Sequence, residues 1–177
     1  MPGSKQLKPL NTTIALLKRL MPSQTLTKPM MKIITDYSAG AVATVNDDGT
    51  PAVSPKATFV IVDNNCIAFG DIRSPGTTAN IKQRPNIEVN FIDVLSRQAV
   101  RVTGRASIVE KDSAQGKKLV PLFQQSWALY LDAMQAFVSI SITRTELILS
   151  PAYDAGHDKA ELTQVNLEKL NRLANSD

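Results

Sequence analysis

The chain has 177 residues, 43% of them hydrophobic and 20% charged, which suits one soluble globular domain and argues against wholesale disorder. Its net charge of +4 permits an anionic partner, but the basic residues are scattered and aromatic residues make up only 5%, so we do not expect nucleic-acid binding. No apolar run approaches the length that spans a bilayer, and Lys18 and Arg19 interrupt the best signal-like stretch, so we expect a cytoplasmic protein without a membrane partner.

Cysteine and histidine each occur once, as Cys66 and His157. This excludes an intrachain disulfide and any metal centre built from several cysteines or histidines of one chain. A Ser-His-Asp hydrolase would depend on His157, and the expected G-x-S-x-G motif is absent. A cofactor would therefore carry any demanding chemistry.

The first 26 residues contain three prolines and one short amphipathic piece, so we expect an N-terminal arm, residues 1–26, that docks on the domain or on a partner subunit. A domain over residues 27–152 follows. Thr27 can cap a helix that carries Pro29 in its first turn and ends near Tyr37. A helical tail over residues 153–177 closes the chain.

Short strands separated by turn residues dominate the first half of the domain. We expect strands over 41–45, 51–58, 59–63 (a continuation of the second strand or a third one) and 66–70, with a turn at Asn46–Gly49. A short helix over 77–84 ends before Pro85.

The second half continues with strands and an expected pair of helices. Strict alternation of apolar and polar residues predicts strands over 87–91 and 100–108. Asp112 or Ser113 can cap a helix to about Val120, and Pro121 can open another. Two final strands, 136–143 and 146–149, should form a hairpin. The fold class predicted from the residues is mainly β (α+β), a closed antiparallel barrel of six or seven strands with short flanking helices.

Two features allow more than one interpretation. Arg101 and Arg105 share one face of their strand, either as a solvated exterior or as a dimer or ligand surface. Trp127 lies in an amphipathic stretch, where we favour a core position over stacking on a ligand.

Polar residues gather around the one break in the strand pattern. Lys56 lies on the strand expected over 51–58, Arg73 and Ser74 follow another strand, and Thr77, Thr78 and Asn80 lie at or near the start of the short helix. A helix N-terminus attracts phosphate through free N–H groups and its dipole, hydroxyls donate to phosphate oxygens, and a lysine or arginine offsets the charge. This predicts a phosphate site, although the same residues also suit a simple helix cap beside a surface lysine.

Three motifs resemble the pyridoxamine 5′-phosphate oxidase-related FMN-binding split-barrel family over about residues 27–148. They are ATVNDDGTPAVSP, FGDIRSPGTTANIKQRPNIEVNFID and RVTGRASIV. Asn80-Ile81 and Pro85-Asn86-Ile87 keep the family's Asn-Leu…Pro frame. The resemblance implies a six-stranded split barrel that works as a homodimer and binds FMN at the subunit interface.

The same resemblance assigns cofactor contacts. The backbone of Val53 and Ser54 would follow the flavin ring, and Lys56 would reach the ring or the phosphate. The ribityl-phosphate end would be surrounded by Asp71, Arg73, Ser74, Thr77 and Asn80, while Gln98 and Arg101 would come from the partner subunit.

This chain departs from the family pattern in two places. Thr77 stands where the family places a lysine, so the phosphate charge must be met by Lys56 or Arg73. The chain also ends without the Arg-x-His pair of true pyridoxamine phosphate oxidases. We expect an FMN-dependent oxidoreductase that acts on an unidentified small organic substrate other than pyridoxamine phosphate. Its expected partners are a second copy of itself and a small-molecule substrate or electron donor. A non-enzymatic flavin binder or electron carrier is the alternative, and another flavin-like or tetrapyrrole cofactor is a third possibility.

Overall fold

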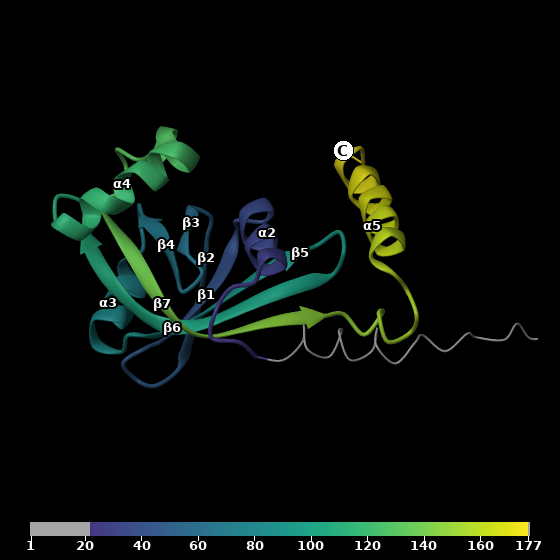
Figure 1. Ribbon diagram of the computed structural model, residues 1–177, viewed down its shortest axis with the longest axis horizontal. Helices are drawn as coiled ribbons and strands as arrows, with labels where there is room; N and C mark the ends of the chain where they lie inside the picture. Colours follow the sequence, from purple (N-terminus) through teal and green to yellow (C-terminus); the bar gives the residue numbers. More distant parts are fainter. Residues whose placement is uncertain (1–21, 177) are drawn as a thin grey trace, which may run out of the picture.

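The computed structural model describes residues 22–176 (Figure 1). The expected N-terminal arm lies mostly outside this range, but Ser23 pairs with Thr145 in an isolated bridge and Leu26 is buried. The helices are α2 (Lys28–Asp36), α3 (Pro75–Gln83), α4 (Ala114–Trp127), the short 3₁₀ helix η1 (Ala128–Tyr130) and α5 (Lys159–Ala174). The strands are β1 (Gly40–Val45), β2 (Pro51–Lys56), β3 (Phe59–Asp63), β4 (Cys66–Asp71), β5 (Asn86–Asp93), β6 (Gln98–Glu110) and β7 (Ala136–Leu149).

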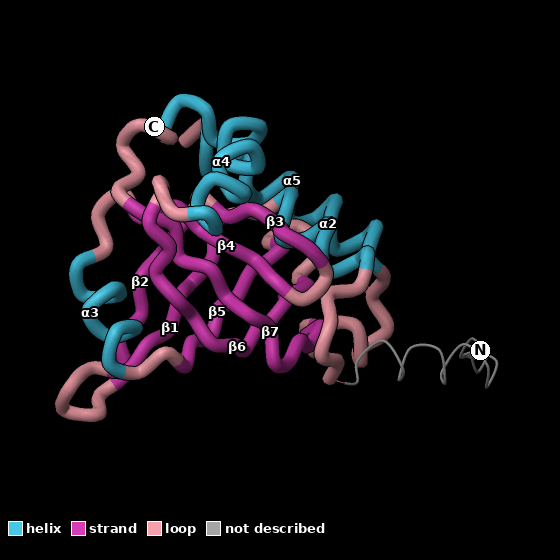
Figure 2. Tube along the Cα trace, turned by 60° about the vertical axis from the view of Figure 1, so that its left-hand side comes forward, coloured by secondary structure: helices cyan, strands magenta, loops and turns pink. Residues whose placement is uncertain are grey.

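All strands belong to one antiparallel sheet of seven strands in the order β2-β1-β5-β6-β7-β4-β3. β2 and β3 occupy opposite ends of this order, yet only Ala57 and Thr58 separate them in the chain. Three Cα–Cα steps span at most roughly 11 Å, so the sheet must curl until its two edges approach each other. Figure 2 shows this curled sheet, and the α+β split-barrel fold expected from the sequence is confirmed.

The barrel interior is filled by alternating side chains of the sheet. On β5, Ile87, Val89 and Phe91 are buried while the residues between them are more exposed, as the alternation predicts. Phe91 packs edge-on against Phe59, with ring centroids 4.7 Å apart. A second apolar cluster lies under α4, where Phe123 stacks on Phe137 at 4.2 Å.

Two predicted element boundaries are wrong. β7 is one continuous strand and not a hairpin, because the polar residues that suggested a turn form a bulge: Thr103 pairs with Arg144 and Gly104 pairs with Ile142. α4 likewise runs through Pro121 as one helix. Its start agrees with the sequence, since the Ser113 hydroxyl accepts a hydrogen bond from Gly116 N at 3.0 Å.

The C-terminal helix α5 stands beyond the ends of β5, β6 and β7, at the opposite end of the molecule from α4 (Figure 1). Two side chains attach this segment to the β5–β6 turn. The Tyr153 hydroxyl donates to Ser96 O at 2.6 Å, and Asn166 Nδ2 donates to Leu95 O at 2.9 Å. Within residues 22–176, no helix is long and apolar enough to cross a membrane.

Candidate functional site

A cavity of about 580 Å³ opens where β2, β4 and α3 meet the end of α4. The link Ala57–Thr58 forms part of its wall, and Thr58 Oγ1 fixes that link to β4 by donating to Gly70 O and accepting from Gly70 N, both at 3.1 Å. We call it the Lys56–Arg73 cavity, and its lining comprises Pro55, Lys56, Ala57, Thr58, Gly70, Ile72, Arg73, Ser74, Trp127 and Tyr130.

Three of the predicted phosphate-site residues therefore meet in one cavity: Lys56, Arg73 and Ser74. Lys56 and Ser54 lie on the same side of β2, as the two-residue period requires, and Lys56 Nζ donates to Ser54 Oγ. Burial lowers the pKa of Lys56, while the nearby Asp71 carboxylate acts in the opposite direction. The cavity thus holds two basic side chains beside a hydroxyl.

The N-terminus of α3 begins at the cavity wall, where Ser74 is one of the lining residues. Ser74 is the N-cap residue, and its side chain makes no capping hydrogen bond. Pro75 has no N–H, and the first backbone bond of the helix runs from Thr78 N to Ser74 O at 2.9 Å. The N–H groups of Gly76 and Thr77 precede that bond and have no partner within the helix, which favours an anion at this end.

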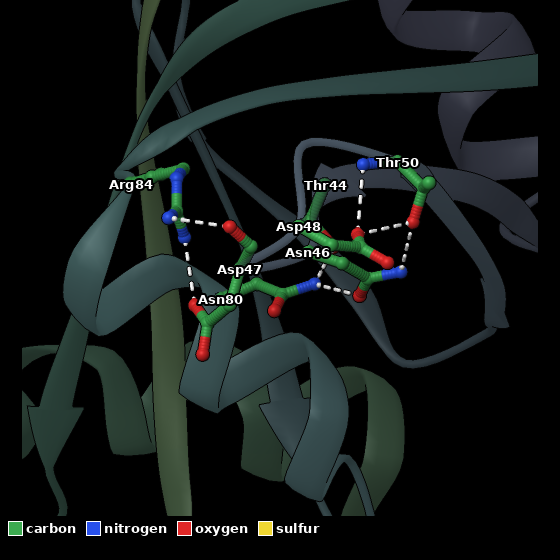
Figure 3. Close-up of polar contacts among 7 residues, drawn as sticks. All are labelled: Thr44, Asn46, Asp47, Asp48, Thr50, Asn80 and Arg84. Carbon is green, nitrogen blue, oxygen red and sulfur yellow. Dashed lines mark hydrogen bonds and ion pairs between the residues drawn. The ribbon is translucent and has the colours of Figure 1, made fainter.

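Thr78 and Asn80 have structural partners of their own. The Thr78 hydroxyl donates to Ser74 O at 3.0 Å, inside the helix. Asn80 Nδ2 donates to Thr44 Oγ1 and Asn46 Oδ1, both at 3.0 Å. Figure 3 shows Asn80 reaching from α3 to the β1–β2 turn.

Arg84 makes a second connection between α3 and the same turn. Its guanidinium donates to the Asp47 carboxylate at 2.8 Å (Figure 3). The turn itself is held by Asp48, whose carboxylate accepts from Thr50 N at 2.9 Å and from Thr50 Oγ1 at 2.6 Å. These contacts fix the position of α3, and with it the direction in which the helix N-terminus points.

We expect Asn80→Ala to lower the free energy of unfolding by about 1–2 kcal/mol, because it removes both hydrogen bonds and leaves the buried Thr44 hydroxyl without that donor. Urea denaturation followed by circular dichroism measures this effect. Thr78→Ala is a suitable control, since its hydroxyl bonds only to its own helix and should matter much less. Equal losses in the two variants would contradict the bridging role of Asn80.

Asp71 and Thr77 are both buried at the edge of this site, with 8% and 7% of their surface exposed. Asp71 Oδ1 is a buried oxygen with no hydrogen-bond partner among the described residues. A buried carboxylate oxygen without a donor is costly, and a ligand hydroxyl or N–H would satisfy it. The polar residues present therefore suit a ligand that carries both a phosphate and donor groups.

Four other predicted residues do not line this cavity, and one of them, Ser54, is connected to it only through its hydrogen bond with Lys56. Val53 lies on the outer side of β2 with 68% of its surface exposed. Gln98 lines a separate groove beside α5. Arg101 forms ion pairs with Glu88 at 3.3 Å and Glu146 at 3.4 Å, across three neighbouring strands.

Two aromatic residues complete the cavity wall. Trp127 is half-buried, and its indole N–H donates to Phe59 O at 2.9 Å, so it combines a packing role with a place on the wall. Tyr130 follows in η1 with half of its surface exposed, and its ring lies 6.4 Å from that of Trp127. Tyr130 was not predicted as a site residue, because nothing in the sequence shows that the end of α4 packs near the start of α3.

Comparisons with known proteins address the family and the fold of the chain. A family model described as pyridoxamine 5′-phosphate oxidase matches residues 26–150. A search of curated proteins finds no match.

Solved structures share the fold. A putative pyridoxamine 5′-phosphate oxidase from Lactobacillus delbrueckii is 25% identical with a TM-score of 0.58, covering 70% of this chain and 94% of its own. An FMN-binding protein from Syntrophomonas wolfei is 9% identical with a TM-score of 0.57, covering 80% and 95%. HutZ, the heme storage protein from Vibrio cholerae, is 19% identical with a TM-score of 0.53, covering 69% and 93%.

Proposed function

Since the chain belongs to the pyridoxamine 5′-phosphate oxidase family, we propose that it binds FMN in the Lys56–Arg73 cavity and acts as a flavin-dependent oxidoreductase on a small organic substrate. One observation carries the proposal: Lys56, Arg73 and Ser74 meet at the free N-terminus of α3, beside Trp127 and Tyr130. When bound, FMN would supply the electron-transfer chemistry that the side chains lack.

The phosphate of FMN suits the basic end of this cavity. It carries nearly two negative charges, which Lys56 and Arg73 would offset, while Ser74 and the N–H groups of Gly76 and Thr77 would donate to its oxygens. The unpartnered Asp71 Oδ1 would accept a hydrogen bond from a ribityl hydroxyl. In this proposal Asp71 binds the ribityl chain, and the basic and hydroxyl side chains bind the phosphate.

Four residues in this proposal lie outside the lining of the cavity, and two of them depend on a partner subunit. The backbone of Val53 and Ser54 would follow the flavin ring, and Gln98 and Arg101 would belong to the partner subunit of a homodimer. Arg101 would have to share its guanidinium between the cofactor and its two glutamates. The one histidine of the printed sequence, His157, has Ala155 and not an arginine two residues before it, which favours a substrate other than pyridoxamine phosphate.

Haem is a second candidate ligand, because the heme storage protein HutZ has the same fold. The single histidine gives little support to haem binding. His157 precedes α5, its Nδ1 lies 3.0 Å from Glu161 Oε2, and it is not part of the Lys56–Arg73 cavity lining. Among residues 22–176, no group of three or more His, Cys, Asp and Glu side chains is placed to hold a metal ion.

The absorbance spectrum of the purified protein tests the proposal directly. We expect the two broad bands of a flavin, and apoprotein titrated with FMN should regain them and quench flavin fluorescence. A single intense Soret band, or saturable binding of hemin with no binding of FMN, would overturn it. Reoxidation of the reduced protein by candidate acceptors, compared with dioxygen alone, then separates an oxidoreductase from a non-enzymatic flavin carrier.

A further inference from the structure

One edge of β7 is covered along only part of its length. β6 pairs with β7 from Ala136 to Leu149, whereas β4 pairs with its other edge only from Ala136 to Ser141. Beyond Ser141, no named strand of the described chain lies beside this edge. An uncovered edge presents unpaired N–H and C=O groups and can accept a further strand.

Ser23 begins such a pairing within the uncovered part. Ser23 N donates to Thr145 O at 2.9 Å, and Thr145 N donates to Ser23 O at 2.5 Å, in an antiparallel bridge. Because the two segments run in opposite directions, the residues that precede Ser23 are directed along the residues that follow Thr145. The register of this bridge places Met21 opposite Leu147.

Leu147 has backbone groups that are free for this pairing. Thr145 directs its N–H and C=O toward Ser23, so Leu147, two residues further along the strand, directs its own groups to the same edge. The bulge of β7 comes before Thr145, so this alternation is unbroken to Leu149. Among residues 22–176, no group on that side hydrogen-bonds to the N–H or C=O of Leu147.

Side-chain burial shows where the cover of this edge ends. In one row of cross-strand neighbours, Val102 and Thr145 are fully buried, and Ser23 lies beside Thr145. In the next row on the same face, Val100 is fully buried, but Leu147, at the edge, is only half-buried. An apolar side chain opposite Leu147 would complete this row.

The sequence before Ser23 suits this position. Met21 supplies an apolar side chain for the row of Leu147. Pro22 has no N–H, and it stands between the two residues that would bond to β7, where an N–H would point away from that strand. A residue that precedes a proline is also biased toward the extended backbone that a strand needs. A shift of one residue would place the proline at a bonding position, which disfavours the alternative register.

We propose that residues 19–21 continue from Ser23 as an additional strand along β7, so that the N-terminal segment docks on its own domain. Residues 1–21 lie outside the described part of the chain, and the bridge between Ser23 and Thr145 fixes the register of the proposed strand. The strand would cover Leu147 with Met21. It goes beyond the proposed function and needs neither FMN nor a second copy of the chain. No described residue of β7 lines the Lys56–Arg73 cavity, so a failure of FMN binding would leave the strand standing.

The double variant Leu20→Cys/Ile148→Cys tests the register by disulfide formation. These two positions would form a non-hydrogen-bonded antiparallel pair, whose Cα atoms lie roughly 4.5 Å apart, within the range of a disulfide. Cys66 is replaced by serine in every cysteine variant, so that its free thiol cannot compete. Oxidation of the full chain should close an intrachain bond, which mass spectrometry detects as the loss of two hydrogens and as one linked pair of tryptic peptides.

The matched control is Arg19→Cys/Ile148→Cys. Side chains alternate along a strand, so residue 19 would face the side opposite to Ile148. Its disulfide should form at least about tenfold more slowly. Equal rates in the two double variants, or a bond between two chains instead of within one, would overturn the proposal.

Proline substitutions test the backbone hydrogen bonds without any cysteine change. Met21→Pro removes the N–H that would donate to Leu147 O, so amide hydrogen exchange at Leu147 should become about tenfold faster or more. Leu20→Pro is the control, because its N–H would point away from β7 and its loss should leave that exchange rate unchanged. Circular dichroism should show the same secondary structure in both variants. Equal effects of the two prolines, or an unprotected Leu147 amide in the parent protein, would show that the strand does not form.

Discussion

Replacing Arg73 by alanine should weaken FMN binding by roughly 1.5–3 kcal/mol, about ten- to a hundredfold. A planar guanidinium can donate to two phosphate oxygens at once, and this arginine follows β4 at the start of α3, on the wall of the Lys56–Arg73 cavity. Thr77, where the family places a lysine, offers no charge to replace it. Lys56→Ala should act in the same direction, and either variant should make the remaining binding more sensitive to salt. Fluorescence titration of the apoproteins with FMN measures the affinity of the parent protein and of the two variants.

Riboflavin provides the control for this prediction, because it lacks the phosphate. It should bind the parent protein poorly and respond little to Arg73→Ala. If Arg73→Ala weakens riboflavin and FMN by the same factor, the arginine contacts the ring or supports the fold, and its assignment to the phosphate is wrong.

Gly116→Ala should lower the free energy of unfolding by about 3 kcal/mol, a large effect for the addition of one methyl group. A Cβ at this buried position would lie 2.0 Å from Glu110 O and 2.5 Å from Lys111 O. The Glu110 oxygen cannot easily move aside, since it accepts from Ser113 N at 3.2 Å and from Ser113 Oγ at 2.7 Å. The start of α4 would have to shift away from the end of β6. Chemical denaturation measures the loss.

Gly76→Ala is the matched control for this substitution. Gly76 also lies in the first turn of a helix, but a Cβ there would meet nothing within 4 Å. The change should be neutral or stabilise the protein by about 0.5–1 kcal/mol, because alanine favours the helix. A similar destabilisation at both glycines would show that the close contacts at Gly116 are not the cause.

Side-chain periodicity predicted the strands well, because local spacing decides which face is buried. β5 keeps strict alternation, and β6 keeps it from Val100 to Ser107. Further along β6, Ile108 was predicted to face inward but is only half-buried, and Val109 is buried instead. Periodicity failed at Thr143–Thr145 and at Pro121, where polar residues or a proline suggested a break. In β7 a bulge absorbs the polar run, and in α4 packing of Phe123 against Phe137 supports the helix on the far side of the proline.

The candidate site was predictable only where its residues are close in sequence or share a strand face. Arg73 and Ser74 adjoin the helix start, and Lys56 shares a face with Ser54, so these could be grouped before the structure was known. The aromatic wall depends on the return of α4 to α3, which is set by tertiary packing. The cofactor contact of Asn80 stays a prediction, but its hydrogen bonds to Thr44 on β1 and to Asn46 in the β1–β2 turn, 36 and 34 residues away in sequence, could not be predicted from the sequence.

The proline content of β2 has a consequence for aggregation. β2 is an edge strand of the sheet order, and it contains Pro51 and Pro55. Pro51 and Pro55 are four residues apart, so both would direct their backbone N–H groups to the same edge of the strand. Because proline has no N–H, both donors are missing from that edge. An edge strand tolerates these losses only where that edge faces away from the neighbouring strand, here β1. The other edge is partly occupied, since the Trp127 indole N–H donates to Phe59 O on β3. Another chain would therefore find fewer free donors on β2 and one free acceptor fewer on β3, which makes both edges less suited to strand-by-strand polymerisation.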